Sequence, residues 1–371
     1  MVPAGTADSM RITVAALRAR AVNVPLRRPL ATGGGTVAAA PLALIDLDTD
    51  AGVTGHSYVV CYTQAALKPT AELIANLGAT LAGDALAPFD IERKLHGRLR
   101  LAGPQGLTGA AASGIDMAAW DALAKACGLP LARLLGGAPR PVPAYNSCGL
   151  GLIGAERAAP EARELADPGF GAIKVRLGYP DLATDLAVLK AVRGAVGDGV
   201  ILMTDYNQCL SVPEAVNRVS ALDGEGVAWI EEPTTAYDYD GHARIAAAAR
   251  TPVQLGENWW GPHDMAKALA AGACDLAMPD AGRIGGVSGW LRAAALAEAR
   301  GMPMSSHLYP EISAHLLAVT PTCHWLEYMD WAEPVLERPL RVDRGMAYAS
   351  ELPGSGIEWN EKAIEKLKAN A

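Results

Sequence analysis

The stretch VILMTDYN, residues 200–207, is an apolar run that ends on an acidic residue, and this arrangement decides the fold. The same order returns along the chain in VAWIEEP (227–233), VQLGEN (253–258), LAMPD (276–280), PMSSHL (303–308) and HWLEY (324–328). Two earlier runs, VPAYNS (142–147) and AIKVRL (172–177), share the apolar character. Alanine-rich stretches of helical pattern separate the runs, and such alternation is typical of a parallel sheet. Eight strands of this kind predict a closed (β/α) barrel of the TIM type.

The first part of the chain has a different pattern. Two runs rich in Val, Ile and Leu, RITVAALRARAVNVPL (11–26) and APLALIDLDTDAGVTGHSYV (40–59), predict a β-meander. The glycine-rich segment ATGGGTVAAA (31–40) between them is expected to be a mobile loop, either a lid over a site or the tip of a hairpin. Residues 64–135 are expected to be helical. Asp116 and Asp121 lie within this region and are expected to be exposed charges on a helix face rather than ligands.

Composition excludes several classes of function. The chain has 371 residues and a net charge of −8, and no Lys/Arg-rich run stands out, so neither nucleic acid nor an anionic membrane is an expected partner. No apolar run reaches the length of a membrane span, and residues 1–26 show no signal-peptide pattern. The six cysteines are scattered without a CxxC pair, which favours reduced thiols. These features predict a cytoplasmic protein.

Polar residues follow the predicted strands where each one ends. Asp205, Glu231 and Glu257 end three consecutive strands, and the spacing between them is close to one βα unit. The carboxyl ends of barrel strands meet at one rim, where barrel enzymes carry their chemistry. Three converging carboxylates need a cation, and hard oxygen ligands favour Mg²⁺. Glu232 is expected to lie behind these ligands, with Asn207 and Asn258 orienting them.

The remaining strands supply groups for proton transfer. Asp280 and His307 end adjacent strands, so a carboxylate would fix the tautomer of the imidazole and raise its basicity, as a general base requires. Glu327 on the last strand would act as an acid. Lys174 and Arg176 lie on one face of an early strand. This layout suits the removal of a proton from the carbon next to a carboxylate, with a cation and a metal holding the substrate.

The chain resembles the enolase superfamily, and within it the mandelate racemase and muconate lactonizing enzyme group, over nearly its whole length. The stretches that carry the resemblance include GIDMAAWDAL, IKVRLGYP, DYNQ, WIEEP, GENW, AMPDA, IGGVSGW, MPMSSHL, EISAHLLA and HWLE. The resemblance implies a modified (β/α) TIM-type barrel with an α+β capping domain built from the N-terminal region and the C-terminal tail. The domains would be residues 1–135 with a flap loop near 31–40, residues 136–330 as the barrel, and residues 331–371 returning to the capping domain.

The resemblance also implies roles for single residues. Asp205, Glu231 and Glu257 would hold Mg²⁺, the His307–Asp280 dyad would be one base, and Glu327 would be the electrophile. Lys174, Ser147 and Asn207 are expected to contact a small carboxylate substrate. Proteins of this kind are typically homo-oligomers, often octamers.

One position departs from the family pattern. The racemases carry Lys-x-Lys on the second strand, and the second lysine is the base opposite the histidine; here that position is Arg176. A guanidinium has a pKa above about 12, which makes it a poor base and a good clamp for carboxylates. One good base favours a one-face reaction such as the dehydration of an acid sugar, with racemisation or epimerisation of a 2-hydroxy acid as the alternative. The glycine-rich flap also offers little apolar wall for an aromatic substrate.

Two other classes of function are a metal-dependent barrel hydrolase and a barrel that binds an acid without catalysis. A metal-dependent barrel hydrolase usually has histidine ligands and an HxH strand motif, and the chain has no HxH. A barrel that binds an acid without catalysis would not need both a metal triad and a His/Asp pair. The sequence therefore favours a lyase or an isomerase.

Overall fold

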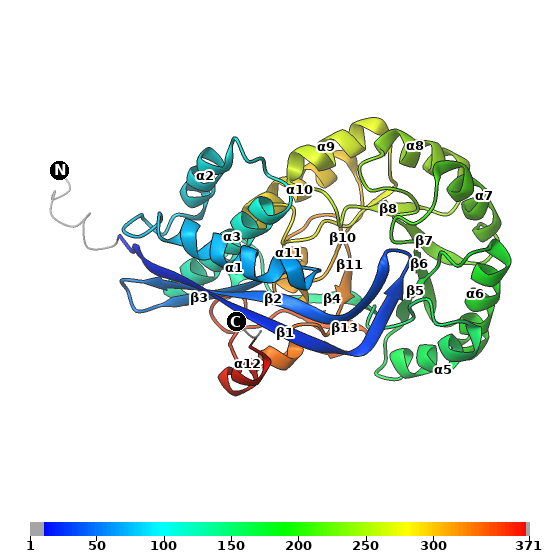
Figure 1. Cartoon of the computed structure of the whole chain (residues 1–371), viewed down its shortest axis with the longest axis horizontal. Coiled ribbons are helices and arrows are strands. Elements are labelled where there is room, and N and C mark those ends of the chain that lie inside the picture. The colour runs from blue at the N-terminus through cyan, green and yellow to red at the C-terminus, as the bar shows by residue number, and fades with distance from the viewer. Residues whose placement is uncertain (1–10, 369–371) are drawn as a thin grey trace.

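The computed structural model describes residues 11–368, and its ribbon is shown in Figure 1. The first ten and the last three residues lie outside the described range, and with them the start of the predicted capping domain. The structure confirms the barrel. Its parallel strands are hydrogen-bonded in chain order and the last closes on the first; they are β4 (Pro141–Asn146), β5 (Ala172–Arg176), β6 (Ile201–Asp205), β7 (Val227–Glu231), β8 (Val253–Leu255), β9 (Leu276–Ala277), β10 (Met304–Ser306) and β11 (Cys323–Tyr328).

A helix follows each strand up to β10 and covers the outside of the barrel (Figure 1). These helices are α5 (Ala155–Ala166), α6 (Leu182–Val196), α7 (Val212–Leu222), α8 (Tyr239–Ala248), α9 (Pro262–Ala271), α10 (Gly286–Arg300) and α11 (Pro310–Ala318). Local sequence sets several of their ends. The side chain of Asp181 accepts a hydrogen bond from the Thr184 amide and so caps α6. Gly272 ends α9 in the left-handed conformation, with φ 67°, which suits glycine best.

The N-terminal region forms an antiparallel sheet covered by helices, as the sequence predicts. The sheet has the order β1 (Val14–Thr32), β2 (Gly35–Thr49) and β3 (Thr54–Val60). The helices are α1 (Gln64–Gly78), α2 (Pro88–Leu99), α3 (Leu107–Ala126) and the short α4 (Leu131–Leu134). One face of the sheet buries Ile45, Leu47 and Val59 against Ile74 and Ile115, which gives this region a hydrophobic core of its own.

The glycine-rich segment is not the long loop that the sequence suggests. Thr32 pairs with Gly35 and Leu30 with Val37, so only Gly33 and Gly34 form the turn of a β-hairpin. Gly35 has φ 128°, which lets the chain turn tightly. The hairpin tip curls toward the barrel (Figure 1), where the Leu152 amide after β4 donates to the Ala31 carbonyl at 2.8 Å. A side chain at Gly33 would collide with Cys209, so glycine permits this close approach.

The C-terminal segment contacts both parts of the chain. It consists of the 3₁₀ turn η2 (Glu333–Val335), β12 (Arg341–Asp343), β13 (Met346–Tyr348) and α12 (Glu361–Leu367). Strand β13 pairs antiparallel with β4 and extends the barrel sheet. The indole of Trp359 donates to Asp46 on β2 at 2.7 Å, and a bridge joins Val22 to Lys368. The segment therefore ties the capping sheet to the barrel.

Asp116 and Asp121 are buried, so the expectation that they are exposed is wrong. Asp116 accepts hydrogen bonds from the amide and the hydroxyl of Ser288 on α10, at 3.0 and 2.6 Å. Asp121 accepts from the amide and the hydroxyl of Ser355, at 2.6 and 2.7 Å. The helix that carries them, α3, packs on the capping sheet, and its carboxylates join it to α10 of the barrel and to the C-terminal segment. Helical spacing alone does not reveal this second buried side.

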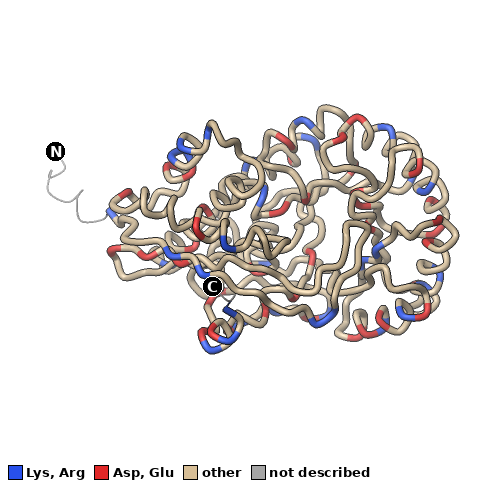
Figure 2. Tube along the Cα trace, viewed as in Figure 1, with Lys and Arg blue, Asp and Glu red and all other residues tan. Residues whose placement is uncertain are grey.

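Charges of both signs alternate along the outer helices of the barrel (Figure 2). Among the described residues, no helix combines the length and the apolar character that crossing a membrane requires.

Strand alternation determines which side chains enter the barrel. Ala172, Met203 and Trp229 pack with Tyr145 and Leu276 in one buried layer. Side chains two residues apart on a strand share a face. Lys174, Asp205 and Glu231, each two positions after a member of this layer, therefore point into the barrel above it, toward the carboxyl ends of the strands.

Candidate active site

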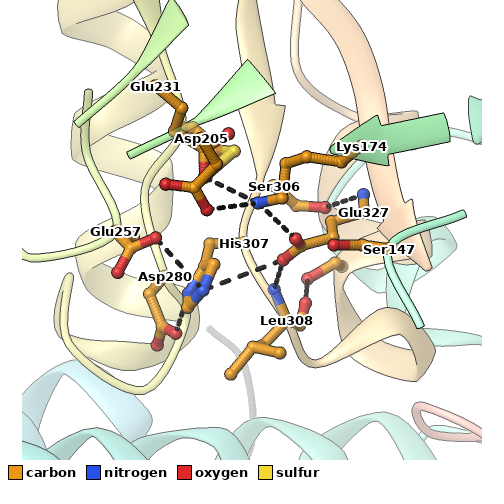
Figure 3. A network of polar contacts seen from close by, with 12 residues as sticks. Ser147, Lys174, Asp205, Glu231, Glu257, Asp280, Ser306, His307, Leu308 and Glu327 are labelled. Atoms are coloured by element: carbon orange, nitrogen blue, oxygen red, sulfur yellow. Dashed lines mark hydrogen bonds and ion pairs between the residues drawn. The ribbon is translucent and has the colours of Figure 1, made fainter. Parts of the chain in front are cut away.

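Three carboxylates converge at the carboxyl ends of neighbouring strands (Figure 3). Asp205 ends β6, Glu231 ends β7, and Glu257 follows β8. One oxygen of each lies within 4.8 Å of the others. Ligands on opposite sides of a magnesium ion are about 4 Å apart. Small side-chain shifts would therefore bring the three oxygens onto one ion, and the all-oxygen set fits Mg²⁺.

Neighbouring amides and an indole hold these carboxylates in place. Asn207 donates to Asp205 from its main chain at 2.7 Å and from its side chain at 2.9 Å. Trp229 and Gln254 each donate to Glu231 at 3.2 Å. The side-chain amide of Asn258 donates to Glu232 at 2.7 Å and to Glu257 at 3.1 Å. Such contacts orient metal ligands and tune their basicity.

The ammonium group of Lys174 lies among the carboxylates, as Figure 3 shows. Its Nζ is 2.7 Å from Glu231, 2.8 Å from Glu327 and 3.3 Å from Asp205. Burial opposes the charge of the lysine, but these carboxylates outweigh it and raise the pKa of Lys174 well above its usual value. Burial, offset in part by Lys174, raises the pKa of Glu231 to about 8. Lys174 is therefore held as a cation between the carboxylates in this arrangement.

His307 and Asp280 form a dyad at the other side of the triad. The Nδ1 atom of His307 is 2.7 Å from Asp280, and its Nε2 atom is 3.5 Å from Glu257. Burial lowers the pKa of His307, but Glu257, Glu327 and the hydrogen bond with Asp280 outweigh burial and raise the pKa to about 9. In the neutral imidazole Asp280 holds the proton on Nδ1, and Nε2 faces the site. A magnesium ion on Glu257 would offset the charge that contributes most to raising this pKa, and Nε2 could then accept a proton.

Glu327 lies between the lysine and the dyad. Its carboxylate accepts a hydrogen bond from the Leu308 amide at 2.9 Å, and one of its oxygens is 3.8 Å from His307 Nε2. Burial favours the neutral acid, but Lys174 and His307 outweigh burial and lower the pKa of Glu327. Glu327 is therefore ionised in this arrangement, and its expected action as an acid requires Lys174 to take another partner.

Arg176 faces the segment that follows β4. Its guanidinium donates to the Ser147 carbonyl at 2.9 Å, the Gly149 carbonyl at 2.7 Å and the Ser147 hydroxyl at 2.8 Å. The Nε–H group is buried and has no acceptor among the described residues. Arg176 thus fixes the position of Ser147.

The structure brings together every residue that the sequence assigned to the site: Ser147, Lys174, Arg176, Asp205, Asn207, Glu231, Glu257, Asp280, His307 and Glu327. Sequence reasoning missed Trp229 and Gln254, which hold Glu231. Trp229 lies two positions before Glu231 on the same strand, so strand alternation places both on one face. Gln254 pairs with Glu231 in the neighbouring strand, so strand register could have identified it. Sequence reasoning also missed Tyr62, which contacts Asp280, and Arg283, which contacts Asn258. Neither residue lies at the end of a barrel strand.

Comparisons with known proteins agree with this geometry. Residues 14–136 match the family described as mandelate racemase / muconate lactonizing enzyme, N-terminal domain. Residues 157–363 match the family described as enolase C-terminal domain-like.

Individual relatives cover most of the chain. L-talarate/galactarate dehydratase from Salmonella typhimurium is 36% identical over 74% of this chain and 70% of its own length. D-galactarolactone cycloisomerase from Agrobacterium fabrum is 32% identical over 88% of this chain and 90% of its own length. A solved structure of an enolase from Bradyrhizobium, complexed with magnesium and mandelic acid, has a TM-score of 0.93 and 46% identity, and the match covers 97% of this chain and 99% of that chain.

The N-terminal and C-terminal domain models match in order along the chain, and the solved enolase from Bradyrhizobium shares the fold over 97% of this chain. The chain therefore belongs to the enolase superfamily, with a mandelate racemase / muconate lactonizing enzyme-like architecture.

Proposed function

We propose that the protein removes the α-proton of a 2-hydroxy carboxylate, and that the substrate is an acid sugar which loses water. Relatives named as dehydratases and cycloisomerases support an enzyme of the lyase or isomerase type. The observation that carries the proposal is the asymmetry of the site. One face has the His307–Asp280 dyad, and the other has Arg176 bound to the Ser147 segment.

Magnesium is the metal that the carboxylate triad fits. Sites of this superfamily combine a Lys or His base with Mg²⁺. Asp205, Glu231 and Glu257 would hold the ion, which would neutralise the triad and stabilise the negative charge of an enediolate.

The protein's own groups divide the reaction between them. Lys174 pairs with the substrate carboxylate, and the hydroxyl of Ser147, whose oxygen already accepts from Arg176, donates to the same end of the substrate. His307 Nε2 takes the α-proton while Asp280 stabilises the imidazolium that forms. The carbon–oxygen bond at the next carbon breaks, the leaving hydroxyl takes a proton from an acid, and the enol product becomes a 2-keto acid.

Glu327 is linked to substrate binding through Lys174. A substrate carboxylate that pairs with Lys174 weakens the ion pair at 2.8 Å that keeps Glu327 ionised. Glu327 is then able to carry a proton and to donate it to an oxygen that gains charge.

The hairpin tip is the part of the proposed flap that sets substrate size. Support comes from its contacts with the segments that follow β4 and β6, next to the site. Its glycines, Gly33 to Gly35, add no apolar wall of the kind that an aromatic substrate would pack against.

Racemisation of a 2-hydroxy acid is the second candidate. It is favoured by the mandelic acid bound in the 46% identical enolase of Bradyrhizobium. Racemisation needs a second proton acceptor on the side of the substrate that faces Arg176, and a guanidinium is a poor proton acceptor.

A substrate panel in D₂O with Mg²⁺ tests both candidates. The panel contains aldonic, aldaric and aryl 2-hydroxy acids, and the products are identified by NMR and by a keto-acid assay. Formation of a keto acid supports dehydration. Deuterated racemate without keto acid supports racemisation and contradicts dehydration. If the magnesium-loaded protein exchanges the α-hydrogen of no acid in the panel, both candidates are contradicted.

A further inference from the structure

The guanidinium of Arg283 connects the capping region with the metal ligands. Arg283 lies three positions after Asp280, just before α10. Its Nη1 atom donates to the side-chain carbonyl of Asn258, and to the main-chain carbonyl of Glu257 at 3.1 Å. Its charge lies over two aromatic rings, with Cζ 4.3 Å from the ring centre of Tyr62 and 5.6 Å from that of Trp260. Arg283 thus contacts the residue that follows Glu257 and an aromatic residue from the capping region.

These contacts determine which way the Asn258 amide points. An amide side chain has one accepting and one donating end. Because Arg283 can only donate, its bond to the carbonyl end leaves the amino end to face the carboxylates. That amino group donates to Glu232 at 2.7 Å and to Glu257 at 3.1 Å. Without Arg283, no other contact of the described residues fixes the carbonyl end of this amide.

Tyr62 holds the guanidinium from the capping side. It follows β3 and covers Arg283 with its ring, an arrangement that stabilises a cation over an aromatic face. Its hydroxyl also donates weakly to Asp280 at 3.4 Å. One side chain of the capping region therefore touches both the proton-transfer dyad and the group that orients the Asn258 amide.

We propose that Arg283 is a positioning residue for magnesium: clamped by the ring of Tyr62, it acts through Asn258 to hold Glu257 in its metal-binding orientation. Among the described residues, Arg283 makes no hydrogen bond or ion pair with the carboxylate oxygens of the three ligands, and it meets Glu257 only at the main-chain carbonyl. Loss of a hydrogen-bonding partner of a metal ligand, such as the Asn258 amide on Glu257, typically costs about 10–100-fold in metal affinity. The inference rests on the proposed metal set of Asp205, Glu231 and Glu257.

Magnesium binding measured by calorimetry on the full-length, metal-stripped protein tests the proposal without any activity assay. Arg283→Met is expected to weaken Mg²⁺ binding about tenfold or more. Arg283→Lys keeps the charge and one donor and is expected to lose less, and it serves as the second variant if the methionine variant does not fold. Tyr62→Phe keeps the ring and is expected to bind Mg²⁺ as the wild type does, whereas Tyr62→Leu is expected to bind it more weakly.

Arg292 offers a matched control. It also joins the capping region to the barrel, through an ion pair with Glu92 on α2 that includes a contact of 2.7 Å, but it does not contact Asn258. Arg292→Met is expected to leave Mg²⁺ affinity unchanged. The double variant Arg283→Met/Asn258→Ala is expected to bind Mg²⁺ about as weakly as Asn258→Ala alone, because Arg283 acts through Asn258.

Three outcomes overturn the proposal. The first is a folded Arg283→Met, or Arg283→Lys in its place, with wild-type Mg²⁺ affinity. The second is an equal loss of affinity in Arg292→Met, which would indicate a general loosening between the two regions. The third is a fully additive double variant. In each of these the wild type still binds Mg²⁺, whereas a wild type that does not bind Mg²⁺ contradicts the proposed function itself.

Discussion

The guanidinium of Arg176 donates to both the carbonyl and the hydroxyl of Ser147, at 2.9 and 2.8 Å. A residue at the position of a racemase base is thus bound to the loop that follows the first barrel strand. In the proposed reaction this leaves one good proton acceptor, His307, with a rigid donor opposite it. Arg176 therefore favours dehydration over racemisation, although the fold is similar to that of racemases.

Arg176→Lys is expected to increase racemisation of a 2-hydroxy acid at least about tenfold, because a base on the second face contributes about 10²–10⁴-fold to proton transfer. Chiral chromatography of deuterated product measures the effect. Arg218→Lys is the matched control, since Arg218 is buried and pairs with Asp185 at 2.6 Å outside the site. A folded, metal-binding Arg176→Lys without a gain in racemisation would count against this account of Arg176.

Glu257→Gln is expected to separate stability from metal binding. The variant removes one of three repelling carboxylates, so its melting temperature in EDTA should equal or exceed that of the wild type. The rise in melting temperature that Mg²⁺ gives the wild type should disappear, because a ligand stabilises only the state that binds it. Thermal unfolding with and without Mg²⁺ measures both effects. Glu298→Gln, on the exposed side of α10, should change neither, and a retained Mg²⁺ shift in Glu257→Gln would contradict the assignment of the ligand.

Asp121→Ala is expected to lower the free energy of unfolding by about 3–5 kcal/mol. The substitution leaves the amide and hydroxyl of Ser355 without this acceptor and removes one of the partners of Lys125, whose Nζ lies 3.0 Å from Asp121. Denaturant unfolding measures the change. Glu156→Ala, on the exposed face of α5, should change stability by no more than about 0.5 kcal/mol. Equal effects in the two variants would show that the buried contacts of Asp121 contribute little.

Stability should depend on pH through His315. Burial, opposed in part by a hydrogen bond with the Ser355 carbonyl, lowers the pKa of His315 from 6.5 to about 4. Above pH 6.5 the imidazole is neutral in both states and its contribution is complete. As the pH falls from about 6.5 toward 4, the unfolded chain binds a proton that the folded protein does not, and about 3 kcal/mol of stability is lost.

His315→Gln should weaken that pH dependence, because glutamine can still accept from the Ala132 amide and donate to the Ser355 carbonyl but does not titrate. Unfolding by urea at several pH values between 4 and 7 measures the slope. His96→Gln, on the exposed face of α2, should keep the wild-type slope. An unchanged slope in His315→Gln would show that another group carries the acid sensitivity.

The barrel and its rim were predictable because both follow from local patterns. Apolar strands alternate with helices, and residues at the strand ends share one rim, so Asp205, Glu231, Glu257, Asp280, His307 and Glu327 could be grouped before any coordinates. Strand alternation also explains why Lys174 points inward with them.

Long-range contacts set the limit of sequence reasoning. Asp116 and Asp121 look like surface charges because helical periodicity describes one buried face and not the second, which packs on a distant part of the chain. The glycine-rich tip becomes a tight turn because strands β1 and β2 continue almost to its end. Tyr62 and Arg283 belong to different regions, and only their packing shows that Tyr62 covers the guanidinium that binds Asn258.

The most direct test of the account is α-hydrogen exchange in D₂O by the magnesium-loaded protein, compared between wild type and His307→Asn. The account predicts that the wild type incorporates deuterium at the α-carbon of its 2-hydroxy acid substrate. It predicts that His307→Asn exchanges at least about 10²-fold more slowly while Mg²⁺ binding is retained, and that His263→Asn, on the exposed face of α9, exchanges at the wild-type rate. Exchange by a folded His307→Asn at the wild-type rate would contradict the central claim that His307 is the base.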